Sequence, residues 1–476
     1  MSQFLPSRYN FAVPAGDGDE RIALFNAGSG ALLVLDGEHS MELAASLLDR
    51  SSPLSCDTFH PNLLEQLRSG EYLIPENLDE VVGIRERYWK ARGETPIVIT
   101  LTTTMDCNLG CYYCYEERSG ARLETGDIQQ IVDLVAARVD ASDRRAVHVD
   151  WYGGEPLLNL EFIEAASSAL QAYCRAYGVS FVASIISNGS VWPDDVEAFV
   201  ARHRIRQVQI SFDGLKAHHD KRRRYRREYK PDSTASTFDR AVELVDRLVQ
   251  CARVDLRFNA DQGNSGDLIP FIEFARRRGW FAAPYPAVFQ PARLASYSTA
   301  SSFMRDHELS LAEFDALRME ARREVGDGAL IEESEVPDGY PYPKTSVCAA
   351  LANNSAVVGA DGLIYRCGLQ VGEQRRAVST LSKAREVAAG SVPEGVGKDA
   401  SWWKAFDPTT QPTCSICSFL PICWGGCPKK HLEGDRHALL EQGRYWRTNL
   451  PRLISQAAGF DLGAADAEVP DSLQFR

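Results

Sequence analysis

The first 95 residues have a hydrophobic pattern typical of a small module of strands and short helices. Arg21–Asp36 is apolar on both sides of a Gly-Ser-Gly turn, which predicts two paired strands. Two helical stretches and a short apolar strand follow, at Met41–Leu48, Leu63–Ser69 and Tyr72–Ile74. We expect residues 1–95 to form a winged-helix-like domain, which a charged helix at Leu78–Arg92 connects to the rest of the chain.

From Pro96 onward, apolar stretches of strand length alternate with amphipathic stretches of helix length. Strands are predicted at Ile97–Thr104, Ala146–Tyr152, Ser180–Ser187, Arg206–Phe212, Val254–Asn259 and Phe281–Phe289. The helices between them are predicted at Ile128–Val139, Leu160–Tyr177, Val196–His203, Phe238–Val249 and Leu268–Arg278. Repeated strand–helix units predict an α/β fold with a parallel sheet, here a partial (β/α)6 TIM-like barrel over residues 96–290. In such barrels the functional residues lie at the C-terminal ends of the strands.

Beyond residue 290 this alternation stops. Residues 291–347 are interpreted as a bridging segment with a helix at Leu309–Glu324. Residues 348–440 are rich in cysteine, glycine and proline and poor in long apolar runs, so we expect the cysteines to organise this domain. Residues 441–476 are interpreted as a C-terminal tail.

The overall charge excludes some classes of partner. With 52 basic and 65 acidic residues, the 476-residue chain has a formal net charge of −13, which argues against general binding to nucleic acid or to anionic membranes. The sequence has no apolar run long enough to span a membrane, and its first residues lack a signal-peptide pattern, so we expect a cytoplasmic protein. In that reducing compartment, the 12 cysteines favour metal binding or redox chemistry over disulfides.

The first cysteine group directly follows the first predicted barrel strand. Cys107, Cys111 and Cys114 are spaced C-x3-C-x2-C. Three thiolates can hold three irons of a [4Fe–4S] cluster and leave the fourth iron open to the amino and carboxylate groups of a small molecule. A zinc site would need a fourth Cys or His close by in the sequence, and none is present.

This motif resembles that of the radical S-adenosylmethionine (SAM) enzymes, and the following strand ends are similar to that family as well. The segment Trp151–Pro156 (WYGGEP) resembles the glycine-rich segment that contacts the amino group of SAM. The cofactor-binding residues that the resemblance implies are Tyr113 near the adenine, Gly153, Gly154 and Glu155 at the amino group, and Ser187, Asn188, Ser211, Asp213 and Asn259 at the next strand ends.

The resemblance also implies a chemistry. In this family, reductive cleavage of SAM gives methionine and a 5′-deoxyadenosyl radical, which removes a hydrogen atom from the substrate. The protein positions the cofactor and excludes water. We expect a reductase, a flavodoxin or a ferredoxin to supply the electron. No general base or acid is assigned, although Tyr285, Tyr297, Arg293 and the Tyr340–Tyr342 loop are candidate cavity residues.

Two further cysteine groups resemble the SPASM extension of radical SAM enzymes that act on peptides and proteins. Cys348, Gly362 and Cys367 are spaced C-x13-G-x4-C, and the later group, C-x2-C-x5-C-x3-C, comprises Cys414, Cys417, Cys423 and Cys427. The resemblance implies two auxiliary iron–sulfur clusters, expected to be [4Fe–4S]. One would be held by Cys348, Cys367 and Cys427, and the other by Cys414, Cys417 and Cys423. One or two zinc sites are the structural alternative.

The sequence departs from the SPASM pattern at one point, because no cysteine follows Cys427. The second auxiliary cluster must therefore use another ligand, be open at one iron, or be reduced in size or absent. Asp435, His437 and His431 are possible substitutes that the sequence does not rank. The first auxiliary cluster also has only three assigned cysteines, so the ligand number of both stays open.

The resemblance restricts the substrate to a class. We expect a maturase that crosslinks or otherwise alters a ribosomally made precursor peptide, whose leader would bind residues 1–95 as an added strand. An oligomerisation domain is the alternative for that module. A sulfatase maturase that oxidises Cys or Ser to formylglycine is the second hypothesis; members of that group often have an Asp after the second SPASM cysteine, where this chain has Gly368. A cluster-bearing electron carrier is a third, but a carrier needs no SAM pocket.

Two features receive structural interpretations. The region Lys216–Lys230 contains a charge run (KRRRYRREYK), which is interpreted mainly as a solvated loop or helix face, with substrate binding as the alternative. Cys56, Cys174 and Cys251 lie outside the three groups and are interpreted as structural, because free cysteine is commonly buried.

Overall fold

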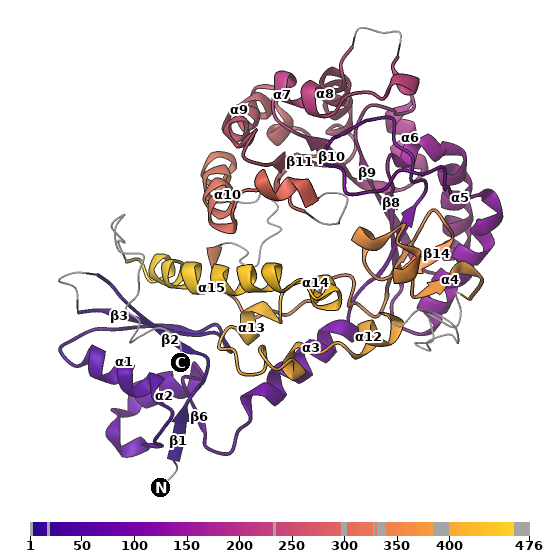
Figure 1. Ribbon diagram of the computed structural model, residues 1–476. Coiled ribbons are helices and arrows are strands. Elements are labelled where there is room, and N and C mark those ends of the chain that lie inside the picture. The colour runs from indigo at the N-terminus through magenta and orange to yellow at the C-terminus, as the bar shows by residue number, and fades with distance from the viewer. Residues whose placement is uncertain are drawn as a thin grey trace. The chain divides into compact units, whose positions relative to one another are not determined.

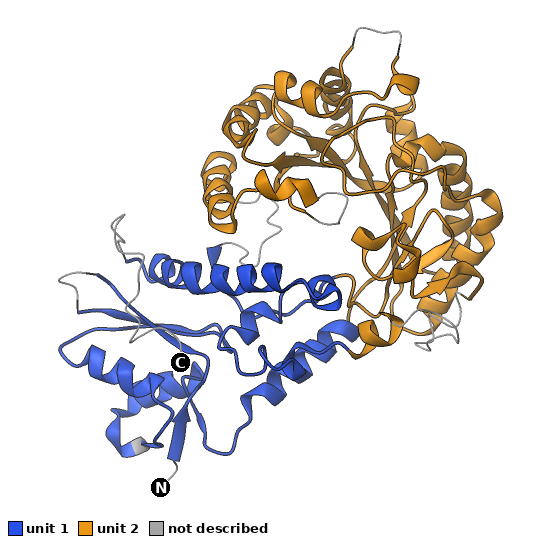
Figure 2. Cartoon of the chain, viewed as in Figure 1, with its two compact units in different colours: residues 1–93, 334–348, 406–476 blue, residues 94–333, 349–405 orange. Residues whose placement is uncertain are grey.

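The computed structural model describes residues 3–16, 20–231, 235–296, 302–326, 329–330, 339–383 and 399–460, without the side chain of Cys56. The chain divides into two compact units (Figure 2). Unit 1 comprises Met1–Gly93, Ser334–Cys348 and Phe406–Arg476, and unit 2 comprises Glu94–Glu333 and Ala349–Ala405. The division follows packing rather than sequence order, since unit 1 combines N-terminal and C-terminal segments.

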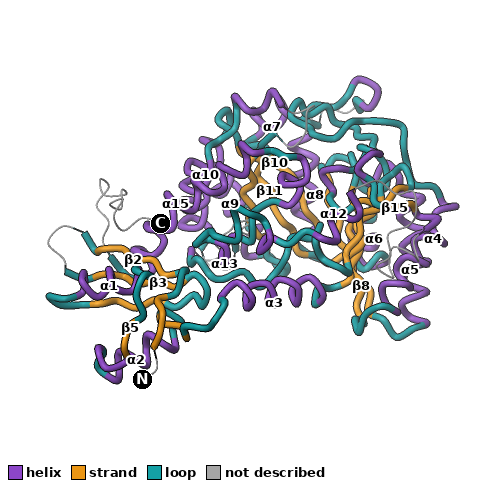
Figure 3. Tube along the Cα trace, turned by 60° about the horizontal axis from the view of Figure 1, so that its bottom comes forward, coloured by secondary structure: helices purple, strands orange, loops and turns teal. Residues whose placement is uncertain are grey.

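Unit 2 is built on a sheet of six parallel strands that neighbour one another in chain order (Figures 1 and 3). The strands are β7 (Ile97–Thr102), β8 (Ala146–Tyr152), β9 (Ser180–Ser187), β10 (Ile205–Phe212), β11 (Arg253–Ala260) and β12 (Val288–Arg293). The helices between them are α4 (Ile128–Asp140), α5 (Leu160–Ala176), α6 (Val196–Arg202), α7 (Lys216–Arg222), α8 (Thr237–Leu248) and α9 (Leu268–Arg277). The predicted α/β fold with a mainly parallel sheet is therefore confirmed.

Alternation of side chains along these strands separates the core from the functional face. In β8, Val147, Val149 and Trp151 are fully buried, whereas His148, Asp150 and Tyr152 point to the opposite face and are only partly buried. Successive strand residues face opposite sides of a sheet, so this pattern fixes which side chains reach the inner face. The same parity brings Tyr152 of β8, Gln209 of β10 and Arg257 of β11 to one cavity.

The sixth strand begins seven residues later than predicted. Val288–Arg293 forms β12, whereas the predicted stretch from Phe281 begins in a 3-10 turn, Trp280–Ala282, whose Trp280 side chain is fully buried. Pro284 and Pro286 separate this turn from β12, and proline supplies no N–H for a sheet ladder. Trp280 therefore fills core space, and the residues between it and Pro284 do not pair as a strand.

The cysteine-rich region extends the sheet beyond β7. β13 (Ser355–Val358) pairs in parallel with β7, and β14 (Leu363–Tyr365) and β15 (Ser379–Thr380) continue it in antiparallel pairs. Sheet pairing therefore supplies backbone hydrogen bonds to residues 355–380, and the role expected of the cysteines in organising this region stays a prediction.

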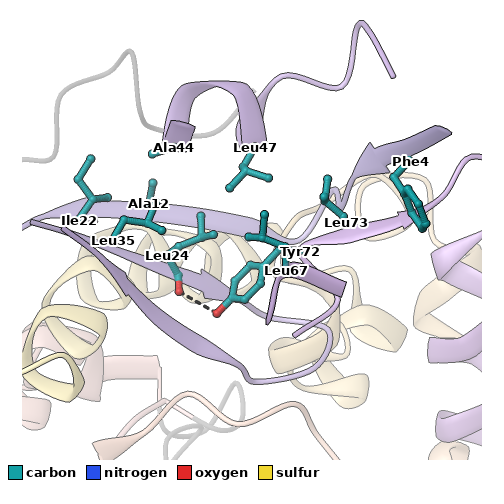
Figure 4. Close-up of a cluster of buried hydrophobic side chains, with 10 residues drawn as sticks. All are labelled: Phe4, Ala12, Ile22, Leu24, Leu35, Ala44, Leu47, Leu67, Tyr72 and Leu73. Atoms are coloured by element: carbon teal, nitrogen blue, oxygen red, sulfur yellow. Dashed lines mark hydrogen bonds between the residues drawn. The ribbon is translucent and has the colours of Figure 1, made fainter. Parts of the chain in front are cut away.

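The N-terminal part of unit 1 contains two small antiparallel sheets. One has the order β2–β3–β4, from Asn10–Pro14, Ile22–Asn26 and Leu32–Leu35, and the other has the order β5–β1–β6, from Leu54–Ser55, Gln3–Pro6 and Leu73–Pro75. Helices α1 (Ser40–Leu48) and α2 (Pro61–Ser69) contribute Ala44, Leu47 and Leu67 to a shared apolar core (Figure 4). The hydroxyl of Tyr72 donates to the carbonyl oxygen of Leu24 at 3.0 Å, which satisfies the buried phenol. The predicted hairpin, helices and short strand are all present.

The remainder of unit 1 is mainly helical. Helix α3 (Glu80–Gly93) is fixed by the hydroxyl of Tyr88, which donates to the carbonyl oxygen of Phe406 at 2.8 Å. Helix α15 (Arg436–Ala457) packs against β2 and β3, so the boundary predicted at residue 440 falls inside a helix. Two short helices complete unit 1, α13 (Leu420–Cys423) and α14 (Pro428–Glu433), whereas α10 (Leu311–Val325) and α12 (Asp399–Ala405) belong to unit 2. None of the helices within the described ranges combines the length and apolarity that crossing a lipid bilayer requires.

Candidate functional site

A cavity of about 330 Å³ lies at the C-terminal ends of the parallel strands of unit 2. All three cysteines of the first group, Cys107, Cys111 and Cys114, line it. Seven of the predicted cofactor-binding residues also line it: Tyr113, Gly153, Gly154, Ser187, Asn188, Ser211 and Asn259. The other two, Glu155 and Asp213, are fully buried and do not line the cavity.

Gly153 and Gly154 allow the loop that begins after β7 and contains Cys107 to lie directly against the end of β8. A Cβ on Gly154 would overlap the Asp106 carbonyl group, 2.8 Å from its carbon, and would lie 3.1 Å from the Cβ of Cys107. Gly153 has a φ of +145°, and a Cβ there would overlap the carbonyl oxygen of Thr104. The N–H of Gly154 donates to that oxygen at 3.0 Å. This close approach requires glycine at both positions.

Glu155 fixes the segment that follows β9. Its carboxylate accepts hydrogen bonds from the N–H of Asn188 at 2.8 Å and from the Ser187 hydroxyl at 2.9 Å. Burial raises the pKa of Glu155 to about 7, and these hydrogen bonds partly oppose that shift. The Asn188 amide in turn donates to the Cys107 sulfur at 3.7 Å. Glu155 thus positions residues of the cavity wall rather than reaching into the cavity itself.

Behind the cavity lies a buried charge network around Asp213. The Tyr113 hydroxyl donates to this carboxylate at 2.8 Å and accepts a hydrogen bond from Arg223 at 2.6 Å. Arg222 donates to Asp213 at 3.1 Å and, through both terminal nitrogens, to Asp261 at 2.8 and 3.1 Å. Tyr113, the predicted adenine contact, is therefore held by charges on both sides of its hydroxyl.

The charge run is not a solvated face near its start. Arg222 and Arg223 are each only 7% exposed, and Arg223 lines the cavity. Their burial is possible because Asp213 and Asp261 supply compensating charge. The interpretation of the run as solvated is wrong for these two residues, whereas it is correct for Arg224, which is exposed.

Several cavity residues were not predicted. Tyr115, Glu116, Tyr152, Gln209, Arg257 and Met304 line the cavity, in addition to Arg293, which was a candidate. The hydroxyls of Tyr115 and Tyr152 are hydrogen-bonded to each other, and burial raises the pKa of Glu116 to about 7. Of the other candidates, Tyr285 is exposed and does not line the cavity, and Tyr297 lies outside the described residues.

The three cysteines that line the cavity can serve as thiolate ligands of one bound group. All three cysteines are free, and burial raises the pKa of Cys107 to about 12 and that of Cys114 to about 11. A bound cation supplies the charge that keeps such thiols deprotonated. Within the described part of the chain, no three Cys, His, Asp or Glu side chains converge as the ligands of a single ion do. A four-iron cluster spreads its ligands more widely, because each binds a different iron.

Five of the six later cysteines lie at two places in unit 1, and the sixth lies in unit 2. Cys348 and Cys427 line one cavity of about 880 Å³, together with Arg87, Gly426 and Gln442. Cys414, Cys417 and Cys423 lie in consecutive turns before and within α13, and the N–H of Cys417 donates to the carbonyl oxygen of Cys414 at 3.0 Å. Cys367 lies in unit 2, two residues after β14.

The three remaining cysteines were interpreted as structural. Cys174 is buried on α5, and the Cys251 thiol donates to the Arg247 carbonyl oxygen at 3.9 Å. Neither lines the two cysteine cavities. The side chain of Cys56 lies outside the described residues.

Comparison with known proteins identifies the domain that carries the cavity. Residues 101–252 match the family described as "Radical SAM superfamily". The chain is 23% identical to mycofactocin maturase MftC of Mycobacterium ulcerans (strain Agy99), over 70% of this chain and 83% of that protein. It is 25% identical to the serine-type anaerobic sulfatase-maturating enzyme of Klebsiella pneumoniae, over 71% of this chain and 83% of that protein.

Two solved structures have a similar fold. The structure of native anSMEcpe with bound AdoMet and Cp18Cys peptide aligns with a TM-score of 0.56 and 17% identity, covering 77% of this chain and all of that one. Streptococcus suis SuiB bound to precursor peptide SuiA aligns with a TM-score of 0.50 and 15% identity, covering 89% of this chain and 95% of that one. Residues 101–252 therefore form a radical SAM domain, in a chain that is similar to enzymes named as maturases.

Proposed function

We propose that this enzyme matures a ribosomally made precursor peptide by removing a hydrogen atom from one of its residues, and that the product is a crosslinked peptide. The observation that carries this proposal is the single cavity that unites Cys107, Cys111 and Cys114 with the strand ends. A cavity with three thiolates on one side and hydrogen-bonding groups on the other suits a cluster together with a small polar cofactor.

The residues around the cavity have distinct roles in this proposal. Cys107, Cys111 and Cys114 hold a [4Fe–4S] cluster, which with SAM supplies a 5′-deoxyadenosyl radical. The backbone at Gly153 and Gly154 and the side chains of Ser187, Asn188, Ser211 and Asn259 orient the cofactor, and Tyr113 packs near its adenine. Glu155 and Asp213 do not contact the cofactor directly. Glu155 positions Asn188, and Asp213 positions Tyr113, through hydrogen bonds.

Arg223 adds a role that the sequence did not reveal. Its guanidinium lines the cavity and is buried, and its Nε atom has no hydrogen-bond partner within the described residues. Asp213 neutralises much of its charge, but the fork of donors suits the carboxylate of SAM. We assign Arg223 to binding that carboxylate.

The later cysteines fit two auxiliary iron–sulfur clusters of the SPASM type. Cys348 and Cys427 of unit 1 are assigned to the first, and Cys414, Cys417 and Cys423 to the second; Cys367, which the SPASM resemblance adds to the first, belongs to unit 2. The shared cavity of Cys348 and Cys427 supports the first assignment. Thiolate ligands require reduced cysteines, which is consistent with a cytoplasmic enzyme that receives electrons from a reductase, a flavodoxin or a ferredoxin.

The strand β4 is the place where a leader peptide would add to the winged-helix-like part of unit 1. β4 pairs only with β3, and Val34 on it is 38% exposed, whereas β2 at the other edge is buried. The N–H of Asn26 donates to the Ala31 carbonyl oxygen, and antiparallel hydrogen bonds alternate, so the N–H of Val34 points away from β3. The solved complex of SuiB with its precursor peptide SuiA supports this class of substrate.

The radical chemistry is tested by reconstituting the protein without oxygen and reducing it with dithionite in the presence of SAM. We expect 5′-deoxyadenosine from the native chain and from Cys251→Ala, which alters a cysteine outside the groups. The triple replacement of Cys107, Cys111 and Cys114 by Ala should lose about four irons per chain and all of this product. Persistence of the product in the triple variant would exclude this cavity as the site.

Leader binding is tested separately, by isothermal titration with synthetic peptides translated from the short reading frames nearest to the gene of this protein. Val34→Pro removes the outward N–H of β4, and Val34→Ala keeps it and serves as the matched control. We expect about a tenfold weaker affinity for Val34→Pro, since one hydrogen bond contributes about 1 kcal/mol and its loss leaves a peptide carbonyl unpaired. Equal affinities of the two variants would exclude addition at β4.

A sulfatase maturase is the second candidate, because the Klebsiella pneumoniae relative carries that name. Gly368, rather than an Asp, follows Cys367, which weighs against it. Incubation with a sulfatase peptide that contains Cys or Ser distinguishes the two. A formylglycine product would replace the precursor proposal, and an unchanged peptide together with a modified precursor would support it.

A further inference from the structure

The second auxiliary group of cysteines has three members, although a [4Fe–4S] cluster has four irons to ligate. These are Cys414, Cys417 and Cys423, since Cys427 lies on the cavity that also contains Cys348. The four-iron clusters of proteins are most often held by four cysteines, but an imidazole can replace a thiolate on iron. The question is therefore which side chain of unit 1 lies beside this group.

His431 on α14 is placed beside it by a left-handed turn of the chain. Trp424, Gly425 and Gly426 have φ values of 49°, 79° and 71°, so the backbone between Cys423 and Cys427 folds back tightly. A Cβ built on Gly425 would lie 3.6 Å from the Cys414 sulfur and 3.5 Å from Nε2 of His431. Nε2 of His431 and the Cys414 sulfur are therefore no more than about 7 Å apart, which is within the span of a four-iron cluster and its ligands.

The orientation of His431 is fixed by a backbone contact. Its Nε2 lies 2.7 Å from the Gly425 carbonyl oxygen, which can only accept, so the ring donates through Nε2–H. A neutral imidazole with its proton on Nε2 keeps the lone pair of Nδ1 for a metal. Histidine ligands typically donate their other N–H to a backbone carbonyl in this way. The contact thus both selects the tautomer and holds the ring.

The rival residues are engaged elsewhere or lack a suitable atom. Asp435 caps α15 by accepting from the N–H of Ala438 at 3.1 Å and pairs with Lys430 at 2.9 Å. His437 is exposed to solvent. Arg447 lies near Cys417 and lowers the pKa of its thiol against the effect of burial, but a guanidinium has no lone pair to offer. Among the candidates that the sequence left open, His431 is the one that a distance places near a cysteine of this group.

We propose that His431 is the fourth protein ligand of the second auxiliary cluster, in place of the seventh SPASM cysteine that this chain lacks. The inference rests on the proposed function only in requiring a cluster at Cys414, Cys417 and Cys423. A neutral imidazole brings one negative charge fewer than a thiolate. The cluster should therefore be easier to reduce than an all-cysteine cluster, as in iron–sulfur centres where histidine replaces cysteine.

The test uses the full-length chain in which Cys107, Cys111 and Cys114 are replaced by Ala, so that the SAM cluster and its nitrogen ligand are absent. After anaerobic reconstitution we expect about eight irons per chain, and about four when Cys414, Cys417 and Cys423 are also replaced. Pulsed EPR of the reduced protein should show the hyperfine coupling of a directly bound nitrogen. Formation of 5′-deoxyadenosine by the unreplaced chain reports on the proposed function independently.

The comparison of His431→Cys with the exposed control His437→Ala decides the assignment. His431→Cys should keep the iron content, lose the nitrogen coupling completely, and lower the reduction potential of the second auxiliary cluster. His431→Ala should lose the coupling as well, and His437→Ala should change neither coupling nor potential. Nitrogen coupling that persists in His431→Cys, or an iron content that Cys414, Cys417 and Cys423 do not affect, would overturn the proposal.

Discussion

Replacing Arg222 by Leu should destabilise unit 2 strongly, because two buried carboxylates lose their main cationic partner. Arg222 donates one hydrogen bond to Asp213 and two to Asp261, and the three side chains are at most 7% exposed. Removing one member of a buried ion pair costs about 3–5 kcal/mol. Arg223 stays 3.5 Å from Asp213, and the N–H of Gly263 still donates to Asp261, so the lower value of about 3 kcal/mol is expected.

The matched control for this variant is in the same charge run. Arg224 is exposed and donates only to the carbonyl oxygen of Lys221, so Arg224→Leu should change the free energy of unfolding by less than about 0.5 kcal/mol. Arg222→Lys should recover part of the loss, since lysine restores the charge but not the two-pronged contact with Asp261.

Urea unfolding of the metal-free, reduced protein, followed by tryptophan fluorescence, measures these differences. A loss of about 3 kcal/mol corresponds to a melting temperature lower by roughly 5 °C for a unit of about 300 residues. The reasoning would be refuted if Arg222→Leu and Arg224→Leu unfolded at the same urea concentration. In that case the carboxylates would be solvated or protonated, and the network would contribute no net stability.

Three further outcomes are expected. Gly154→Ala must displace the Asp106 carbonyl by about 1 Å to relieve the overlap with the new Cβ. This displacement should lower the rate of SAM cleavage by about 100-fold in a 5′-deoxyadenosine assay. The control Gly126→Ala, whose Cβ would meet no atom within 4 Å, should match the native rate. Burial lowers the pKa of His203 to about 4, below the value of about 6.5 in the unfolded chain, so its stabilising contribution is lost as the pH falls through this interval. Between pH 7 and pH 5 the native chain should therefore lose about 2 kcal/mol more than His203→Gln in urea unfolding, and an equal loss would contradict the shift. Tyr113→Phe removes the hydroxyl between Asp213 and Arg223 and should weaken SAM binding severalfold in equilibrium dialysis, while Tyr285→Phe, on an exposed residue outside the cavity, should not.

The parts of the fold that sequence patterns predicted are those in which local residues decide the structure. The strand Ser180–Ser187 is rich in Val, Ile and Phe, and the helix at Leu160 has a continuous apolar face, so a local pattern indicates each of them. The cysteine loop and the strand-end motifs were predicted for a related reason. In a parallel sheet the order of the strands brings their C-terminal ends together, so order along the chain translates into proximity.

The features that were not predicted depend on contacts between distant residues. The run from Lys221 to Lys230 has the composition of a solvated face, and only the carboxylates of Asp213 and Asp261 make burial of Arg222 and Arg223 favourable. The one signal of this burial in the sequence was that the run follows Asp213, which stands at the end of a predicted strand. The pairing of Ser355–Val358 with β7 joins segments more than 250 residues apart, and no local pattern carries that information.

The strand β12 forms one edge of the sheet of unit 2, and this edge affects how the folded protein behaves at high concentration. The N–H of Phe289 is used by the Ala329 carbonyl oxygen, and Pro291, two residues on and facing the same way, has no N–H. Free strand edges with intact donors invite edge-to-edge association between molecules, and a proline on the edge removes that opportunity. This border of the sheet is thereby protected from intermolecular aggregation, and an incoming peptide strand must join the protein elsewhere.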